Sequence, residues 1–213
     1  MFTRVASIGM AMLLVAGATG CKSDPGRERT KATVGTIQDT RAEMAAGLGE
    51  IEAVQATIIA LQNTAGDQVG LYNTYKKQVA AVETRSERVG EAADDMARRS
   101  QEYRQAWQQE AGQISDPALR DAAQARAAAV RDRLTNVFEN YRIAKNAYYP
   151  FVAKLKDVQT FLSNDLTAGG VKAATPSLQD AVKLGDDLKA KTKVVISDLD
   201  AASARLSPAT QPR

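Results

Sequence analysis

Apolar side chains recur along most of the chain at alternating spacings of three and four residues. This spacing places them on one face of an α-helix, and no strand-like alternation competes with it. The repeat is most regular in two central stretches, where a seven-residue period predicts helices that supercoil left-handed around one another. The repeating positions are Tyr75, Val79, Val82, Ser86, Val89, Ala93, Met96, Ser100, Tyr103 and Trp107 in one stretch, and Ala123, Ala127, Val130, Leu134, Val137, Tyr141, Ala144, Tyr148, Phe151 and Leu155 in the other.

Three breaks divide this pattern into four helical stretches. We place them at Asn63–Gly70, Ile114–Pro117 and Ala168–Pro176, because glycine, proline and short polar residues gather there. In the last break, Thr175 before Pro176 is typical of a helix start, since a threonine side chain caps the first turn and proline fits the first helical position. The sequence therefore predicts an all-α fold, an elongated antiparallel bundle of about four long helices with coiled-coil packing.

The short breaks favour a simple up-down-up-down connection, in which the second helix returns toward the start of the first. If the two central stretches fold back at Ser115, the numbers of facing positions sum to about 230 in a common heptad register. In that register Tyr75 faces Leu155, and Glu110 lies opposite Arg120.

The N-terminal segment has the organisation of a secretory signal. Arg4 supplies a positive charge, residues 8–18 form a short apolar run, and the small residues 18–20 precede Cys21. The apolar run is well short of the ~20 residues that a membrane-spanning helix needs. The segment resembles a lipobox, the signal after which a cysteine is acylated and becomes the new N-terminus. An ordinary secretory signal is the alternative.

These features divide the chain into four parts. Residues 1–20 are predicted to be a lipoprotein signal peptide and residues 21–29 a lipidated polar tether. Residues 30–206 are predicted to form the helical bundle, and residues 207–213, with two prolines, a flexible tail.

The predicted anchor sets an expected location. Two or three acyl chains on Cys21 exceed the marginal binding of a single chain, so attachment to the lipid bilayer should be permanent. Lys22, rather than aspartate, follows the cysteine and resembles an outer-membrane sorting signal in hosts with two membranes. We therefore expect a cell-envelope lipoprotein, in the outer membrane facing the periplasm, with Trp107, Ile114 and Arg120 close to the anchored end.

Composition narrows the possible chemistry. The 213 residues contain no histidine and one cysteine, Cys21, which removes imidazole bases, disulfides and ordinary zinc sites. Aromatic residues make up only 5% of the chain, which suits long, thin helical packing. The formal net charge is +3 with both signs interleaved, whereas a nucleic-acid-binding surface needs a concentrated basic face. We expect no enzyme activity, no cofactor, no metal and no nucleic-acid partner.

Two kinds of local pattern could suggest chemistry but have simpler interpretations. Asp94 with Asp95, and Asp186 with Asp187, are paired carboxylates, yet adjacent residues on a helix point about a hundred degrees apart. Solvated helix surface explains them better than a metal or acid–base site. The glycines at 169–170 lack the preceding strand and lysine of a phosphate-binding loop.

Three aromatic residues are candidates for an interaction site: Trp107, Tyr148 and Tyr149. Tyr148 and the nearby Phe151 fall on the heptad seam, so core packing is the first explanation for them. Pro150 is expected to kink the third helix, because it removes one backbone hydrogen bond and crowds the preceding turn.

Several short segments, together with the lipobox-like start, resemble one protein family. They are Trp107 with Glu110, Tyr149 to Val152, Leu155 to Val158, Phe161 with Leu162, and Ser177 to Gln179. The family is a set of bacterial lipoproteins of about this length, known as domain-of-unknown-function family 2959. The resemblance covers most of the mature chain and implies a long-helix envelope lipoprotein, with no activity or catalytic residues to transfer.

The leading functional hypothesis is a membrane-anchored envelope lipoprotein with a structural or protein-interaction role, whose partner is an unknown envelope protein or a second copy of itself. The alternative is a ligand-binding or envelope-stress sensing helical module with a pocket near Tyr148, Tyr149 and Pro150. An enzyme ranks third, since serine with lysine or carboxylate partners occurs at no telling spacing.

Overall fold

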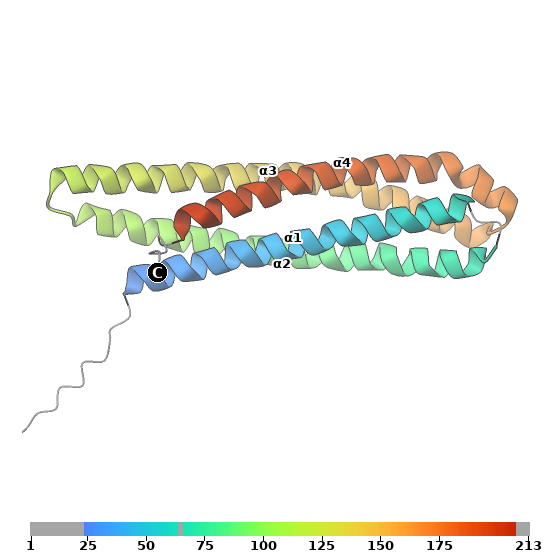
Figure 1. The fold of residues 1–213 in the computed structure, drawn as a ribbon, viewed down its shortest axis with the longest axis horizontal. Helices are drawn as coiled ribbons and strands as arrows, with labels where there is room; N and C mark the ends of the chain where they lie inside the picture. Colours follow the sequence, from blue (N-terminus) through green and yellow to red (C-terminus); the bar gives the residue numbers. More distant parts are fainter. Residues whose placement is uncertain (1–23, 64–65, 208–213) are drawn as a thin grey trace, which may run out of the picture.

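The computed structural model describes residues 24–63 and 66–207, and four long helices account for nearly all of them. The helices run alternately up and down in chain order and form one elongated bundle (Figure 1). The predicted all-α antiparallel four-helix fold is confirmed. The helices are α1 (Pro25–Asn63), α2 (Gln68–Gly112), α3 (Pro117–Asn164) and α4 (Ala168–Leu206).

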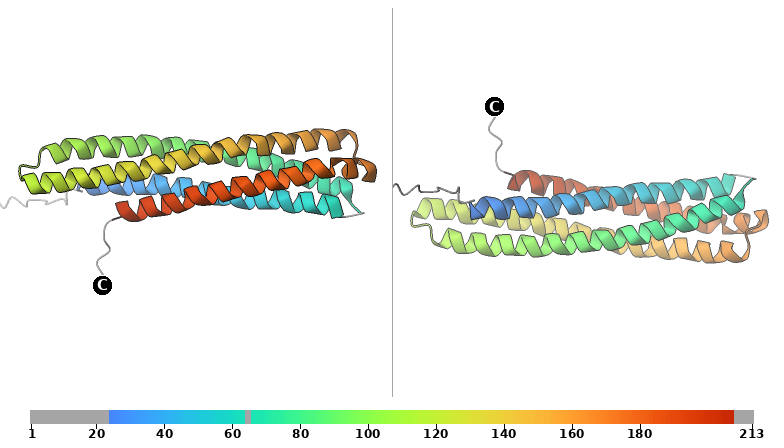
Figure 2. Two further views of the ribbon diagram at one scale, coloured as in Figure 1. Left: turned by 90° about the horizontal axis from the view of Figure 1, so that it is seen from above. Right: turned by 90° about the horizontal axis from the view of Figure 1, so that it is seen from below.

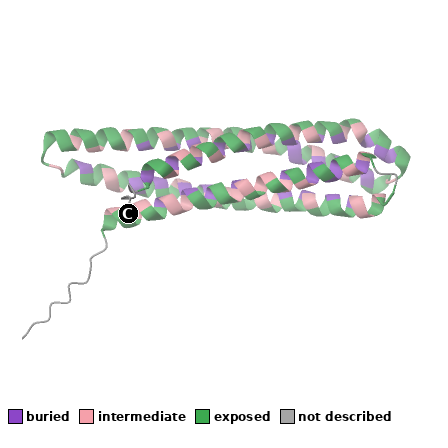
Figure 3. Ribbon diagram, viewed as in Figure 1, coloured by how far each residue is buried: buried purple, intermediate pink, exposed green. Residues whose placement is uncertain are grey.

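Each helix packs against two neighbours and faces the fourth helix across the core. α1 and α3 each contact α2 and α4, whereas the diagonal pairs have no close backbone approach (Figure 2). The backbones of α2 and α3 come close together at fewer positions than those of the other neighbouring pairs. Buried residues occur on all four helices and are sparse at the end with the α2–α3 connection, where α3 has its first buried residue at Val130 (Figure 3). Those with essentially no exposure include Ile37, Tyr75, Phe151, Leu155, Leu178 and Leu199.

Two tyrosines show how α2 and α3 are aligned. The Tyr75 hydroxyl donates to the Leu155 carbonyl at 2.8 Å, and the Tyr72 hydroxyl donates to the Gln159 carbonyl at 2.9 Å. Burial raises the pKa of the Tyr75 phenol, which keeps it a hydrogen-bond donor. Tyr75 and Leu155 thus face each other as the heptad register predicts.

The predicted start of the last helix is wrong. The break before α4 ends at Thr167, and the helix includes the whole of the predicted break at Ala168–Pro176. The Thr167 hydroxyl accepts the Gly170 N–H at 3.1 Å and so caps the first turn. The Thr175 hydroxyl instead donates to the carbonyl four residues earlier, within the helix, and Pro176 lies inside α4.

The beginning of the folded part also differs from the prediction. α1 starts at Pro25 rather than at Thr30, so the second half of the predicted tether at 21–29 is helical. The Asp24 carboxylate accepts the Gly26 N–H at 3.0 Å at this helix start.

The remaining predictions about the termini and Pro150 stay predictions. The predicted signal peptide at 1–20, Cys21 and tail residues 208–213 lie outside the described residues, and Ser207 follows the end of α4. α3 is continuous across Pro150, and the kink there stays a prediction.

Among residues 24–63 and 66–207, one helix, α1, is long and apolar enough to cross a membrane by length and composition. A helix of this kind near the N-terminus is compatible with a signal sequence or membrane anchor on those grounds alone. Many of its large apolar side chains, among them Ile37, Ile51 and Ile58, are buried against the other helices, whereas Ile59 is exposed. We therefore interpret α1 as a core helix of the bundle.

Gly185 provides a test of how tightly α4 packs. A β-carbon at this position would lie 2.7 Å from the Gln55 amide nitrogen and 3.0 Å from the Phe151 ring. Glycine-to-alanine substitution inside a helix normally stabilises by about 0.5–1 kcal/mol, but overpacking a core costs about 1–3 kcal/mol. We expect Gly185→Ala to lower the free energy of unfolding in urea, and Gly49→Ala, where the added carbon meets open space, to raise it. Equal stabilisation by both substitutions would contradict the packing at Gly185.

Candidate interaction sites

The apolar core is divided into two clusters along the bundle axis. One lies toward the α1–α2 connection and includes Phe151 and Leu178, and the other lies toward the start of α1 and includes Ile37 and Leu199. Between them all four helices line a cavity of about 110 Å³. This is somewhat smaller than the ~150 Å³ engineered cavity that binds benzene, so there is room for a small apolar group.

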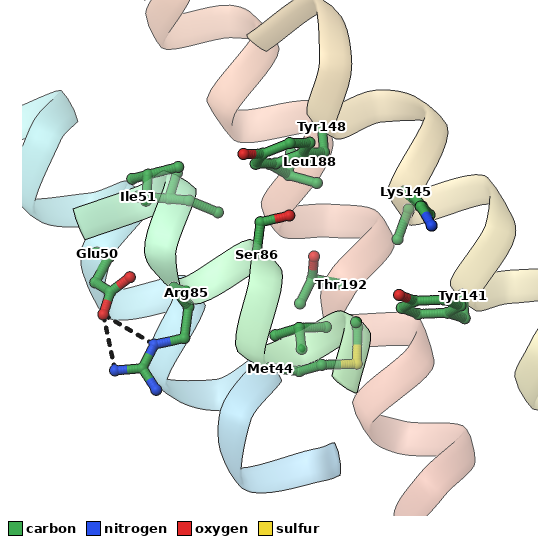
Figure 4. Close-up of a pocket in the computed structure, with 15 residues that line it drawn as sticks. Met44, Glu50, Ile51, Arg85, Ser86, Tyr141, Lys145, Tyr148, Leu188 and Thr192 are labelled. Atoms are coloured by element: carbon green, nitrogen blue, oxygen red, sulfur yellow. Dashed lines mark hydrogen bonds and ion pairs between the residues drawn. The ribbon is translucent and has the colours of Figure 1, made fainter. Parts of the chain in front are cut away.

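The walls of this central cavity combine apolar side chains with hydroxyl groups. Figure 4 shows Ser86 and Thr192 pointing into the space between Tyr148 and Tyr141. Burial raises the pKa of Tyr148, and a hydrogen bond with Ser86 acts in the opposite direction. The apolar part of the wall comes from Met44, Ile51, Val82, Val89, Ala144 and Leu188.

A charged group from α2 closes one side of the cavity. The Arg85 guanidinium donates to Glu50 Oε1 at 2.9 Å and also pairs with Glu43, so it joins α2 to two residues of α1 that lie about two turns apart. Its side chain is only 20% exposed. The second carboxylate oxygen of Glu50 is buried without a hydrogen-bond partner among the described residues. These two carboxylates raise the pKa of Arg85, so the guanidinium stays charged.

The sequence predicts a pocket near Tyr148, Tyr149 and Pro150, and of these three residues Tyr148 lines the central cavity. The charged layer around Arg85 was not predicted from the sequence. Ser86 was recognised only as a small residue on the seam. The sequence feature that indicates the cavity is a set of small residues, Ser86, Gly47 and Gly90, which all line it. At Gly90 nothing lies within 4 Å of where a β-carbon would stand. Several small residues at one level of a bundle leave volume that the neighbouring helices do not fill.

The structure does not bring the three predicted interaction residues together. Tyr148 lines the central cavity, while Tyr149 is 56% exposed and packs its ring edge-on against Tyr148 with centroids 5.8 Å apart. Trp107 lies elsewhere, near the start of α1. Tyr149 is thus available to a partner at the middle of the bundle, and Trp107 belongs to a separate site.

Trp107 lies beside a groove of about 530 Å³, here called the terminal groove, between the start of α1, the end of α4 and the α2–α3 hairpin. Its ring packs edge-on against Tyr103 at 5.4 Å, and the Arg126 guanidinium lies 6.0 Å from its centroid. Glu110, expected opposite Arg120, pairs with Arg29 of α1. The Arg120 guanidinium donates to the Ser115 carbonyl at 3.4 Å, and the facing of Glu110 and Arg120 stays a prediction.

The paired carboxylates behave as surface groups with local partners. Asp95 pairs with Arg98 on the same helix. Hydrogen bonds from Lys189 and Gln55 lower the pKa of Asp186. In the part of the chain that the structure describes, no group of three or more His, Cys, Asp or Glu residues is arranged to hold a metal ion.

By its fold and its candidate sites, this protein is a long antiparallel four-helix bundle with a small central cavity and a groove at one end. The chain belongs to the family described as Protein of unknown function (DUF2959), whose model matches residues 22–206. The resemblance to this family is thereby confirmed, and its lipoprotein character stays a prediction. Neither the search of curated proteins nor the search of solved structures finds a match.

The Arg85 cluster generates a stability prediction. Replacing Arg85 by alanine leaves Glu43 and Glu50 without their shared cation in a half-buried layer, and hydrogen bonds to charged groups are worth about 1.5–3 kcal/mol. We expect Arg85→Ala to lower the free energy of unfolding by about 1–2 kcal/mol. Arg98 also contacts two carboxylates, but it lies exposed on one helix, so Arg98→Ala should change little. Urea unfolding of both variants measures the difference, and equal effects would contradict it.

Proposed function

We propose that this protein is a lipid-anchored component of the bacterial cell envelope with a structural or protein-interaction role and no enzymatic activity. Its anchor is the acylated Cys21. Its partner is another envelope protein or a second copy of the chain, and it takes no cofactor. In a host with two membranes the proposed location is the outer membrane, facing the periplasm.

The observation that carries the proposal is the closeness of the bundle to the predicted anchor. The lipobox-like segment ends at Cys21, and α1 begins only four positions later at Pro25. The family match starts at residue 22, directly after that cysteine. A leader that is removed before Cys21 would leave the whole family region as the mature protein.

Replacing Cys21 tests the anchor. We expect Cys21→Ser to leave the leader uncleaved and to abolish metabolic labelling by a fatty-acid analogue, because a serine hydroxyl cannot form the thioether. Ser23→Ala, two residues away, is the matched control and should be labelled like the parent. Labelling of Cys21→Ser at the parental level would refute acylation at this residue.

In-cell crosslinking tests the interaction role. A photoreactive amino acid in place of the exposed Tyr149 should give a defined adduct with one envelope protein or with the chain itself. A chain that stays monomeric and yields no adduct from this position, or from Trp107, would contradict the interaction role.

The central cavity favours a second candidate function, a ligand-binding or envelope-stress sensing module. Small amphiphiles such as a lysophospholipid, or cell-wall fragments, should raise the melting temperature if a part of them fills the cavity. Gly90→Leu would place a side chain in that space and should abolish the shift, whereas Gly49→Leu should preserve it. A shift that survives Gly90→Leu would place binding elsewhere.

A further inference from the structure

The connection between α2 and α3 extends beyond the start of α1 and the end of α4, and the overhang is visible in every view (Figures 1 and 2). The Thr40 hydroxyl lies 3.0 Å from the Ala92 carbonyl, so α1 and α2 are level there. Equal numbers of residues separate Thr40 from Pro25 and Ala92 from Trp107, so α1 begins level with Trp107. Helix α2 continues to Gly112, and at ~1.5 Å per residue this overhang, with the turn, measures roughly 10 Å.

The overhanging residues 111–119, here called the hairpin tip, present an almost uncharged surface. Their only ionisable side chain is that of Asp116, whose carboxylate accepts the Leu119 N–H at 3.0 Å as a helix cap. Leu119 is 63% exposed, and Ile114 is half-buried beside the terminal groove. The hairpin tip therefore offers aliphatic side chains to its surroundings, while its single charge is held by the backbone.

The short segment between Cys21 and the start of α1 limits how far the hairpin tip can lie from the membrane. Only three residues separate Cys21 from Pro25. At ~3.3–3.6 Å per residue, the cysteine lies within roughly 14 Å of the start of α1, close to the length of the overhang. This step rests on the proposed acylation of Cys21. When the bundle axis stands along the membrane normal with α1 starting at the membrane, a cysteine held at the bilayer surface by its acyl chains places the hairpin tip within a few ångströms of the lipid headgroups.

We propose that the hairpin tip is a second, non-covalent contact with the bilayer that carries the anchor. Leu119 and Ile114 enter the headgroup region, and Trp107 with Arg126 lies just behind them. Amphipathic tryptophan and arginine side chains suit this position, since each has an apolar body and a polar group for the interface. Two attachment points, one covalent and one through the tip, fix the direction in which the bundle leaves the membrane.

The test uses the full chain, expressed with its leader and reconstituted in vesicles of phosphatidylethanolamine and phosphatidylglycerol. Leu119→Cys introduces a thiol at the tip, and Val69→Cys introduces one in the first turn of α2 at the opposite end, where Val69 is 62% exposed. In an acylated protein the sulfur of Cys21 is a thioether, so each new thiol reacts alone with a bimane fluorophore. With nitroxide groups on the lipid headgroups, the label at 119 should lose most of its fluorescence and the label at 69 should keep it.

The parent protein without an added cysteine distinguishes failure of the proposed Cys21 anchor from failure of the proposed contact between the hairpin tip and the bilayer. If it takes up the fluorophore, Cys21 is a free thiol, and the proposed anchor fails together with this inference. If it stays unlabelled and the labels at 119 and 69 are quenched equally, the inference is overturned while the anchor stands. A label at 119 that is shielded from lipid nitroxide and from aqueous iodide, together with disulfide-linked dimers of the unlabelled Leu119→Cys protein after mild oxidation, would make a second copy the occupant and also overturn it.

Discussion

Burial of one narrow apolar face along each of four long helices is the constraint on which this structure depends. A single helix cannot cover its own seam, and each one here packs against two neighbouring helices. The ion pairs between helices, such as Arg41 with Asp200 and Lys156 with Glu83, lie at the flanks of these seams. Exposed pairs of this kind contribute little stability. Packing of the seam therefore holds the bundle together, and the charges border it.

The charged layer around Arg85 has a different role from the apolar seams. The repeat in α1 is weaker than those in α2 and α3, and apolar contacts alone permit alternative alignments of α1 along the bundle. Arg85 reaches Glu43 and Glu50, and the Thr40 hydroxyl reaches the Ala92 carbonyl, so these polar contacts require one alignment. We infer that this layer defines the register of α1, and that packing is less complete at this level, where the cavity lies.

The features that follow from the periodic spacing of apolar residues could be predicted from the sequence. The features that depend on which helix supplies a contact could not. The heptads were sufficient for the helical fold and for the facing of Tyr75 and Leu155. Thr175 before Pro176 has the composition of a helix start, but the cap is made by Thr167, because the chain turns directly after α3. The pairing of Glu110 with Arg29 depends on a helix that lies outside the predicted hairpin. The central cavity likewise depends on residues from all four helices at one level.

The division of the core into two clusters affects how parts of the bundle unfold locally. Cooperative opening units follow contiguous buried packing, and here two such units share the same four helices end to end. The cluster with Phe151 and the cluster with Ile37 are separated by a level of small, polar and charged side chains that stabilises the helices less. Fraying at the α2–α3 end therefore need not spread past the middle. Amide hydrogens in the two halves should then exchange as separate foldons, so that one half remains closed while the other opens.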